Sequence, residues 1–466
     1  MESIRNKLGW GLSGALALLL LAALAGVVHG GPLDPTAPPG STGKNVITAL
    51  PFTISQPGSY VLNSNLTGVS GQNGITVNAG NVTIDLQGFE LVGAGGALSG
   101  IAQNSGANVS VEHGTIRNWP AWGISAGDGS VIDDLHALQN GRGMVLGSWA
   151  SVSNCEVQGS TASYGIRASE GATITHCRVE GNAPGGTSAN GIEVGGSSTI
   201  TETVARNNGG TEILAGDKVT LENCVADGVG TPGNGIQVGF WSSIRGCSAF
   251  NNGGVEILAG WSATLENCVA DGNVSAEDGI RVGQDSTIRG CTARNNGGEE
   301  IEAASTSVLV DCVADGLGTA GYGILVGENS RVSGCTARNN GDTEIATAGD
   351  RVLIENCIAD GWTGSAKGAG NGILLGHAST VRGCTLENNG NMGIWVNGGN
   401  NRIEGNHVRA NSQIGIYVPS VGNFVALNDS ALNGAGASDN CAAAAGNDFV
   451  MVFTATGANS FDNVCD

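Results

Sequence analysis

The sequence predicts an all-β solenoid, in which about 15 coils of roughly 22 residues stack on one another and each coil holds three short strands. Three observations lead to this fold class. A long internal repeat runs through the middle of the chain, apolar residues recur at fixed places in it, and 79 of the 466 residues are glycines set between them. Such units bury their apolar faces by stacking, which is typical of solenoids.

The long repeat consists of two related units. The first reads ENCVADG at residues 222–228, and the second reads IRGCTARNNG at residues 288–297. Copies of the two units alternate along the chain, so each long repeat contains two coils. Copies of the first lie at 266–272, 311–316 and 355–361, and copies of the second lie at 244–253, 332–341 and 381–390.

Each coil contributes one residue, usually cysteine, to a column that we call the ladder position. The residues three before it and two after it are apolar in every coil from Cys155 to Asn406, so we expect both to point inward. The residue just before it is usually Asn or Gly, which accept a left-handed backbone and predict a bend. The ladder positions are Cys155, Cys177, Thr203, Cys224, Cys247, Cys268, Cys291, Cys312, Cys335, Cys357, Cys384, Asn406 and Asn428, preceded by Gly114 and Leu135.

A third strand completes each coil. Residues 235–238 (GIQV), 279–282 (GIRV) and 323–326 (GILV) alternate between apolar and variable positions, as a strand with one buried face does. Stacking at about 4.8 Å per coil then closes the hydrogen-bond ladders and the core together. A helical solenoid is disfavoured, because Gly, Asn and β-branched residues are too frequent.

These patterns give the chain a family resemblance. Residues 81–88 (NVTIDLQG) and 113–118 (HGTIRN) look like opening coils, and with the ladder the chain resembles the right-handed parallel β-helix repeat proteins of the pectate-lyase-like superfamily over about residues 46–429. The resemblance implies the fold. It does not choose an activity, because the group includes lyases, hydrolases, esterases, epimerases, adhesins and proteins without known chemistry.

The composition excludes one class of partner. The formal net charge is −21, and the chain has four lysines, Lys7, Lys44, Lys218 and Lys367. Nucleic-acid binding needs clustered Lys and Arg, so it is not expected. A polyanionic partner would need a bridging cation.

The N-terminus predicts export. Arg5 and Lys7 precede an apolar run and a small-x-small cleavage pattern that ends near Ala25. A single membrane anchor is the alternative, but the run is short, so we expect a secreted protein with no stable membrane insertion after cleavage. We therefore divide the chain into a signal peptide (1–25), a Pro/Gly-rich linker (26–45), the β-helix (46–433) and a C-terminal capping tail (434–466).

The twelve cysteines have two expected roles. Ten occupy ladder positions, where buried cysteine behaves as a small apolar residue, so we interpret them as core; disulfides or metal binding remain the alternative. Cys441 and Cys465 lie outside the ladder in the tail. Those two are candidates for a disulfide that fixes the C-terminal end.

Charged residues also fall into columns. Two residues before the ladder position, Glu222, Arg245, Glu266 and Arg289 alternate in sign, which predicts ion pairs that fix the register of stacked coils. Another column holds one glutamate in every second coil, and we interpret its members as solvated structural carboxylates. We expect no cofactor. Weak Ca²⁺ binding at this column is the one alternative that we leave open. Its members are Glu212, Glu256, Glu300 and Glu344.

A search for catalytic residues identifies none. The outward positions of the third strand do not bring three carboxylates together, and Arg167 with Glu193 and Arg281 with Glu302 are expected ion pairs. The remaining carboxylate pairs, 133–134 and 277–278, are interpreted as turn or loop residues. Among the histidines, none are paired at metal-ligand spacing. We therefore assign no metal site and leave the catalytic residues unknown.

Aromatic residues supply the candidate binding site. Phe240 and Trp261 occupy the same turn of successive coils, Trp241 lies beside them, and Trp149 lies farther down. Trp395 and Tyr417 form a weaker second candidate on the third strand. Exposed aromatic rings can stack on sugars, whereas packing against a neighbouring loop is the alternative.

The sequence therefore favours a secreted, non-catalytic β-helix that binds extracellular or cell-surface polysaccharide. Two alternatives stay open. One is a polysaccharide lyase or glycoside hydrolase that acts on an acidic polysaccharide. The other is a purely structural component of a cell envelope.

Overall fold

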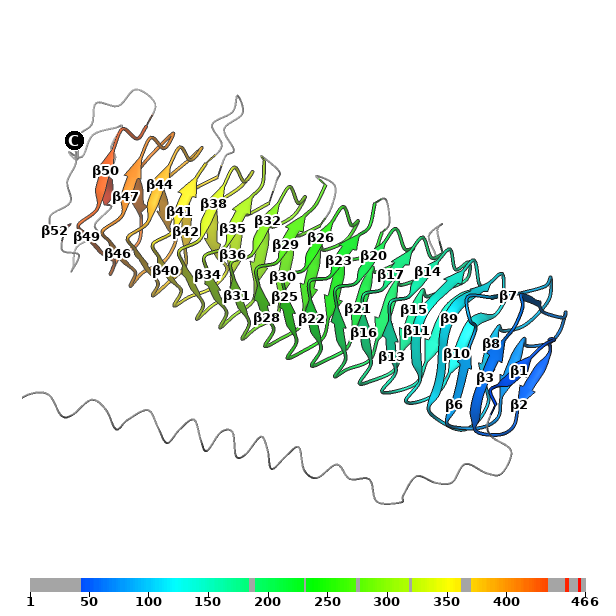
Figure 1. The fold of residues 1–466 in the computed structure, drawn as a ribbon. Coiled ribbons are helices and arrows are strands. Elements are labelled where there is room, and N and C mark those ends of the chain that lie inside the picture. The colour runs from blue at the N-terminus through cyan, green and yellow to red at the C-terminus, as the bar shows by residue number, and fades with distance from the viewer. Residues whose placement is uncertain are drawn as a thin grey trace, which may run out of the picture. The chain divides into compact units, whose positions relative to one another are not determined.

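The computed structural model describes residues 43–183, 189–229, 232–273, 277–317, 321–361 and 370–434, and the backbone of 449–451 and 460–461. The structure divides into Met1–Lys44 and Asn45–Asp466. Within the second unit the described elements are all strands, from β1 (Asn45–Ile47) to β52 (Ser460–Phe461), stacked in one long succession (Figure 1). In the described part of the chain no helix has the length and apolar character needed to cross a membrane.

One coil shows how the strands are arranged. The coil that contains Cys224 consists of β22 (Thr220–Glu222), β23 (Val225–Asp227) and β24 (Ile236–Val238). We call the sheets that these three strands enter the first, second and third faces. Each strand pairs in parallel with its counterpart one coil later, β25 (Ser243–Arg245), β26 (Ser248–Phe250) or β27 (Ile257–Ala259). About 16 such turns confirm the predicted three-strand solenoid.

The first and second faces merge near the N-terminus. There β9 (Val109–Arg117) and β11 (Val131–Leu138) each run through both faces as one strand. On the third face the strands extend from β2 (Phe52–Ile54) to β51 (Phe449–Met451).

The predicted inward columns form the core. Around the ladder position Cys224, Leu221 and Ala226 are both 0% exposed, and the corresponding residues of the other coils are buried as well. Register joins Leu221 to Ile244 and Ala226 to Ala249, so like residues stack along the tube. The period-two alternation of a half-buried strand therefore holds on all three faces.

The bend before the ladder position has the predicted left-handed backbone. Asn223 has φ 53° and Gly246 has φ 59°, and the pattern repeats in later coils. All ten ladder cysteines are buried and free, which confirms their interpretation as core residues. They also hydrogen-bond: Cys224 Sγ donates to Ile200 O (3.4 Å), and Cys224 N donates to Cys247 Sγ (3.4 Å).

The alternating charge columns form the predicted ion pairs. Arg245 Nε lies 3.0 Å from Glu266 Oε2 on the first face, and Arg294 Nη2 lies 2.8 Å from Asp271 Oδ2 on the second. Most of these Arg side chains are about half exposed, so each pair adds little stability by itself. Their alternation opposes a slip of register, because a slip would place like charges side by side.

The structure corrects our interpretation of Glu212, Glu256, Glu300 and Glu344, which are buried rather than solvated: their exposures are 0%, 0%, 1% and 1%. Each carboxylate accepts hydrogen bonds from an asparagine four residues earlier in the same coil. Asn208, for example, donates from its backbone N to Glu212 Oε1 at 2.9 Å and from Nδ2 to Oε2 at 2.5 Å. The solvated interpretation is therefore wrong, whereas weak Ca²⁺ binding at this column stays a prediction.

The neighbouring coil explains why a carboxylate is needed there. Where asparagines stack directly, the next one accepts these bonds: Asn389 N donates to Asn411 Oδ1 at 3.1 Å. Above Asn208, register places Val229, which is 60% exposed and offers no inward acceptor. Glu212 thus supplies the acceptor that Val229 does not.

Candidate functional site

Three exposed aromatic residues cluster on two successive turns between the third and first faces. Trp241, Trp261 and Phe240 are 61%, 55% and 39% exposed. The Phe240 ring centroid lies 5.9 Å from that of Trp241 and 5.4 Å from that of Trp261. We call Phe240, Trp241 and Trp261 the aromatic ridge. The structure therefore brings together three of the six predicted binding residues.

The turn that carries the ridge does not require aromatic residues. Ser242 Oγ closes it by donating to Gly239 O at 3.0 Å, and Trp241 at its tip has φ 56°. Lys218, Ser262 and Asp285 occupy this left-handed position in neighbouring coils. A bulky residue is strained there, and its exposure adds a second cost, so folding does not explain Trp241.

Part of the ridge packs against the next coil. A Cβ added to Gly260 would lie 2.7 Å from Phe240 Cδ1, and one added to Gly283 would lie 2.2 Å from Trp261 Cδ1. The glycines therefore make room for the rings, which supports the edge-packing interpretation for one side of each ring. The exposed area of Trp241 and Trp261 remains available to a ligand, with Lys218 Nζ 5.7 Å from the Trp241 ring.

The other three predicted residues lie apart from the ridge. Trp149 is 65% exposed on an equivalent turn four coils away, roughly 19 Å along the stack at about 4.8 Å per coil. Trp395 and Tyr417 are partly buried partners on adjacent third-face strands, β45 (Ile394–Val396) and β48 (Ile416–Val418). Cys441 and Cys465, the predicted disulfide, lie outside the described residues.

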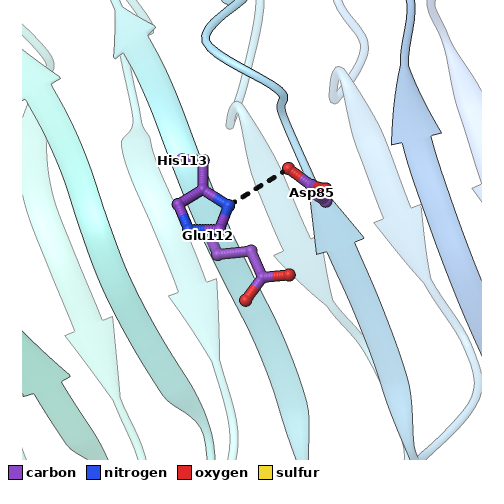
Figure 2. A group of neighbouring side chains, drawn as sticks. All are labelled: Asp85, Glu112 and His113. Atoms are coloured by element: carbon purple, nitrogen blue, oxygen red, sulfur yellow. Dashed lines mark hydrogen bonds and ion pairs between the residues drawn. The ribbon is translucent and has the colours of Figure 1, made fainter.

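An acidic site that was not predicted from the sequence lies on the first face. Asp85, Glu112 and Asp133 are register partners on β6 (Val82–Asp85), β9 and β11, so three carboxylates occupy one column on successive coils. We call these three residues the acidic column. Figure 2 shows Asp85 and Glu112 on neighbouring strands with His113 directed at Asp85, and His113 Nδ1 lies 3.3 Å from Asp85 Oδ1. Ligand atoms of Asp85, Glu112 and His113 all lie within 4.8 Å of one another.

Neutral donors hold one end of the acidic column. Ser153 Oγ and Asn154 Nδ2 donate to Asp133 Oδ1 at 2.6 Å and 2.9 Å. These two hydrogen bonds, with a smaller contribution from His113, lower the pKa of Asp133. Later coils place an Arg between carboxylates in this column, as at Arg245, whereas here three acids follow one another.

A signal for this site was present in the sequence. Glu112 and Asp133 stand two residues before the ladder positions Gly114 and Leu135, which is the offset of the alternating charge column. Away from the third strand, only carboxylates adjacent in sequence were compared, so Asp133 was interpreted with Asp134 as a turn residue and not with Glu112 of the preceding coil.

A second acidic group is structural. Asp278 Oδ1 accepts a bond from Glu299 N at 3.0 Å, just as Asn234 Oδ1 accepts one from Val255 N at 2.8 Å in an equivalent coil. Burial, and then a hydrogen bond with Glu299, raise the pKa of Asp278 to about 7, while Arg281 opposes the shift. Arg281 Nε also lies 2.6 Å from Glu302 Oε2, the ion pair that the sequence predicted.

The third face carries a second missed feature. Arg142 lies over the Trp122 ring at 5.5 Å, and Arg167 lies over the Tyr164 ring at 5.1 Å. Arg167 Nε also pairs with Glu193 Oε1 at 3.2 Å, as predicted. These residues give the N-terminal part of the third face a mixed aromatic and cationic surface.

Comparison with known proteins supports the fold. The family model described as "Right handed beta helix region" matches residues 190–322 and 316–452. No curated protein matches the sequence.

Solved structures resemble the chain at low sequence identity and with low TM-scores. The A-module of the mannuronan C-5 epimerase AlgE4 of Azotobacter vinelandii is 14% identical, with a TM-score of 0.38 over 79% of this chain and 91% of that chain. The pectate lyase Pel9A is 13% identical, with a TM-score of 0.32 over 64% and 71%. The Dettilon tailspike protein is 12% identical, with a TM-score of 0.27 over 78% and 58%.

Proposed function

Because the chain belongs to the family of proteins with a right-handed β-helix region, whose fold leaves function to the surface side chains, we propose that it is an exported protein that binds an uncharged polysaccharide without catalysis. One observation carries the proposal: the aromatic ridge exposes two tryptophans and a phenylalanine on a turn that does not need them. Export rests on the N-terminal sequence. N-terminal sequencing of the exported protein should find a start close after Ala25.

The physical chemistry of the ridge fits a sugar ligand. Aromatic rings offer large, rigid apolar faces that lose little conformational entropy when a ligand binds. The rings are held by their contacts with each other and with the next coil, so the surface is formed before binding. A net charge of −21 repels polyanions, which favours an uncharged chain of sugars.

Binding to neutral and acidic polysaccharide arrays tests the proposal. The full-length triple variant Phe240→Ala, Trp241→Ala and Trp261→Ala should bind a neutral ligand at least about tenfold more weakly, since each lost ring removes roughly 0.5–1.5 kcal/mol. The matched control replaces Val229, Leu317 and Leu427, which are 60%, 55% and 61% exposed elsewhere, by Ala. Equal binding by the two triple variants would refute the role of the ridge.

The acidic column favours a second candidate function, a polysaccharide lyase or glycoside hydrolase that acts on an acidic polysaccharide. Three carboxylates on strands about 4.8 Å apart repel one another unless a cation lies among them. Oxygen ligands of this kind suit Ca²⁺, and a bound cation would attract an acidic substrate despite the net charge of the protein. His113 would then be available as a general base.

An activity assay separates the two candidates. The chain would be incubated with alginate, pectin and glycosaminoglycans, with and without Ca²⁺, and new reducing ends or unsaturated products would be measured. The second candidate requires product formation that Asp85→Asn with Glu112→Gln abolishes and that Glu266→Gln, a control in the same column, leaves intact. Absence of any product would count against it and leave the binding proposal standing.

A further inference from the structure

Four glutamates lie inside the solenoid at intervals of two coils, each bonded through both carboxylate oxygens to one asparagine. Asn252, Asn296 and Asn340 donate from their backbone N to Oε1 of the partner glutamate at 3.0, 3.1 and 3.3 Å, as Asn208 does at 2.9 Å. Their Nδ2 groups donate to Oε2 of the same carboxylates. The partners are Glu212, Glu256, Glu300 and Glu344.

The charges that face these carboxylates are acidic. Asp227 faces Glu212 and Glu256, and the other second-face aspartates are placed likewise: Asp271 faces Glu256 and Glu300, Asp315 faces Glu300 and Glu344, and Asp360 faces Glu344. Arg294 and Arg338 bond to Asp271 and Asp315 from outside, with side chains 53% and 51% exposed. Among described residues, no Lys, Arg or His forms an ion pair with any of the four glutamates.

Burial without a compensating cation among the described residues favours a proton at these sites. A protonated carboxyl carries no charge and still accepts hydrogen bonds through its carbonyl oxygen. An ionised carboxylate there would instead add a buried charge beside aspartates, which is costly.

We propose that the four buried Glu–Asn pairs are a pH-operated latch: protonated, they hold the corner between the second and third faces closed, and ionised, they loosen the coils between Asn208 and Asp360. The pairs recur along one corner, so their effects add over four successive long repeats. The latch is independent of ligand binding at the aromatic ridge.

The direction of the pH effect follows from burial. Burial raises the pKa of Glu212, Glu300 and Glu344 to about 8 and that of Glu256 to about 7, against the opposing hydrogen bonds from asparagine. In the unfolded chain these carboxyls return to the ordinary value of 4.5. The stability that they contribute is complete below pH 4.5 and is lost as the pH rises toward 7 to 8.

Infrared spectroscopy of the folded full-length protein tests the proton directly. At pH 6 the native chain should show the absorption of protonated carboxyl groups, and this band should disappear as the pH rises to 9. The Glu256→Gln variant should lose about a fifth of the band and the fourfold Glu→Gln variant most of it, since Asp278, whose pKa is raised to about 7, supplies the remainder. A native chain without this band at pH 6 would overturn the proposal.

Unfolding midpoints test the latch itself. Between pH 5 and 9 the midpoint of the native chain should fall more steeply than that of the fourfold Glu→Gln variant, since glutamine mimics the protonated state at every pH. The control variant replaces three exposed glutamates, Glu170, Glu277 and Glu328, by glutamine and should keep the native pH slope. Should the fourfold variant fail to fold, Glu256→Gln alone must still reduce the slope. Parallel slopes for native and variant chains would disprove the latch.

Discussion

At the scale of single residues, polar side chains inside the tube replace backbone partners that the corners lack. The ladder cysteines are one example. Cys291 Sγ accepts a bond from Cys268 N at 3.4 Å, and in the coil of Asn406 the amide oxygen Oδ1 accepts the equivalent bond from Cys384 N at 2.9 Å. A buried N–H without an acceptor costs roughly 1–3 kcal/mol, so the choice among Cys, Thr and Asn at this position is limited by hydrogen bonding as well as volume.

This role predicts an asymmetry between neighbouring cysteines. Cys291→Val should lower the free energy of unfolding by about 1–3 kcal/mol, because it leaves Cys268 N without an acceptor. Cys291→Ser should cost less, since the hydroxyl can accept the same bond. Denaturant titration measures both. The matched control is Cys268→Val, which removes a donor to Ile244 O and Glu266 O but leaves Cys291 Sγ in place as the acceptor. We expect it to lower the free energy of unfolding less than Cys291→Val does. Equal losses would contradict this account.

At the scale of the element, the bend before the ladder position explains why the repeat spans two coils. A Cβ added to Gly290 would lie 2.5 Å from Asn267 Oδ1 of the preceding coil, and one added to Gly246 would lie 2.6 Å from Asn223 Oδ1. The asparagine side chain fills the space next to the following bend, which must therefore be glycine. Asn and Gly alternate for this steric reason, while Glu and Arg alternate for an electrostatic one.

Two alanine substitutions separate the steric effect from the backbone effect. Gly290→Ala has to accept both a left-handed backbone, φ 60°, and the clash with Asn267. Gly405→Ala accepts only the backbone strain, because φ is 63° and no atom lies within 4 Å of the added Cβ. The left-handed backbone costs roughly 1–2 kcal/mol, so we expect that loss for Gly405→Ala and a larger one for Gly290→Ala in thermal or chemical unfolding. The reverse order would refute the steric explanation.

At the scale of the whole molecule, two coils form the unit that can be removed without disturbing the rest. Deleting residues 246–289 joins Arg245 to Gly290 and preserves the sequence Arg-Gly-Cys, the alternation of charges and the alternation of Asn with Gly. Deleting residues 223–245 removes one coil and places Glu222 next to Glu266. Like charges directly opposed are destabilising by roughly 0.2–1 kcal/mol, and the Glu–Asn pairs also lose their spacing.

These deletions give a prediction about stacking. The two-coil deletion should keep the far-ultraviolet circular dichroism of a β protein and lower the melting temperature less than the one-coil deletion does, although it removes more of the chain. Stability in a solenoid is approximately the sum of coil and interface contributions, so the intact interface decides the outcome. A larger loss for the two-coil deletion would show that the charge and Asn–Gly alternations do not set the unit of stacking.

The sequence by itself determined the fold, the inward columns, the bends, the buried cysteines and the position of the aromatic ridge, because each depends on local spacing that repeats in every coil. Only the tertiary structure decided the burial of Glu212 and the assembly of Asp85, Glu112 and Asp133. Both depend on the neighbouring coil. Glu212 is buried beside a coil in which the exposed Val229 offers no acceptor. The three acidic residues meet because of the register between the irregular coils near the N-terminus. Contacts between coils depend on the register and on the path of each loop, and a pattern read along one coil does not contain either.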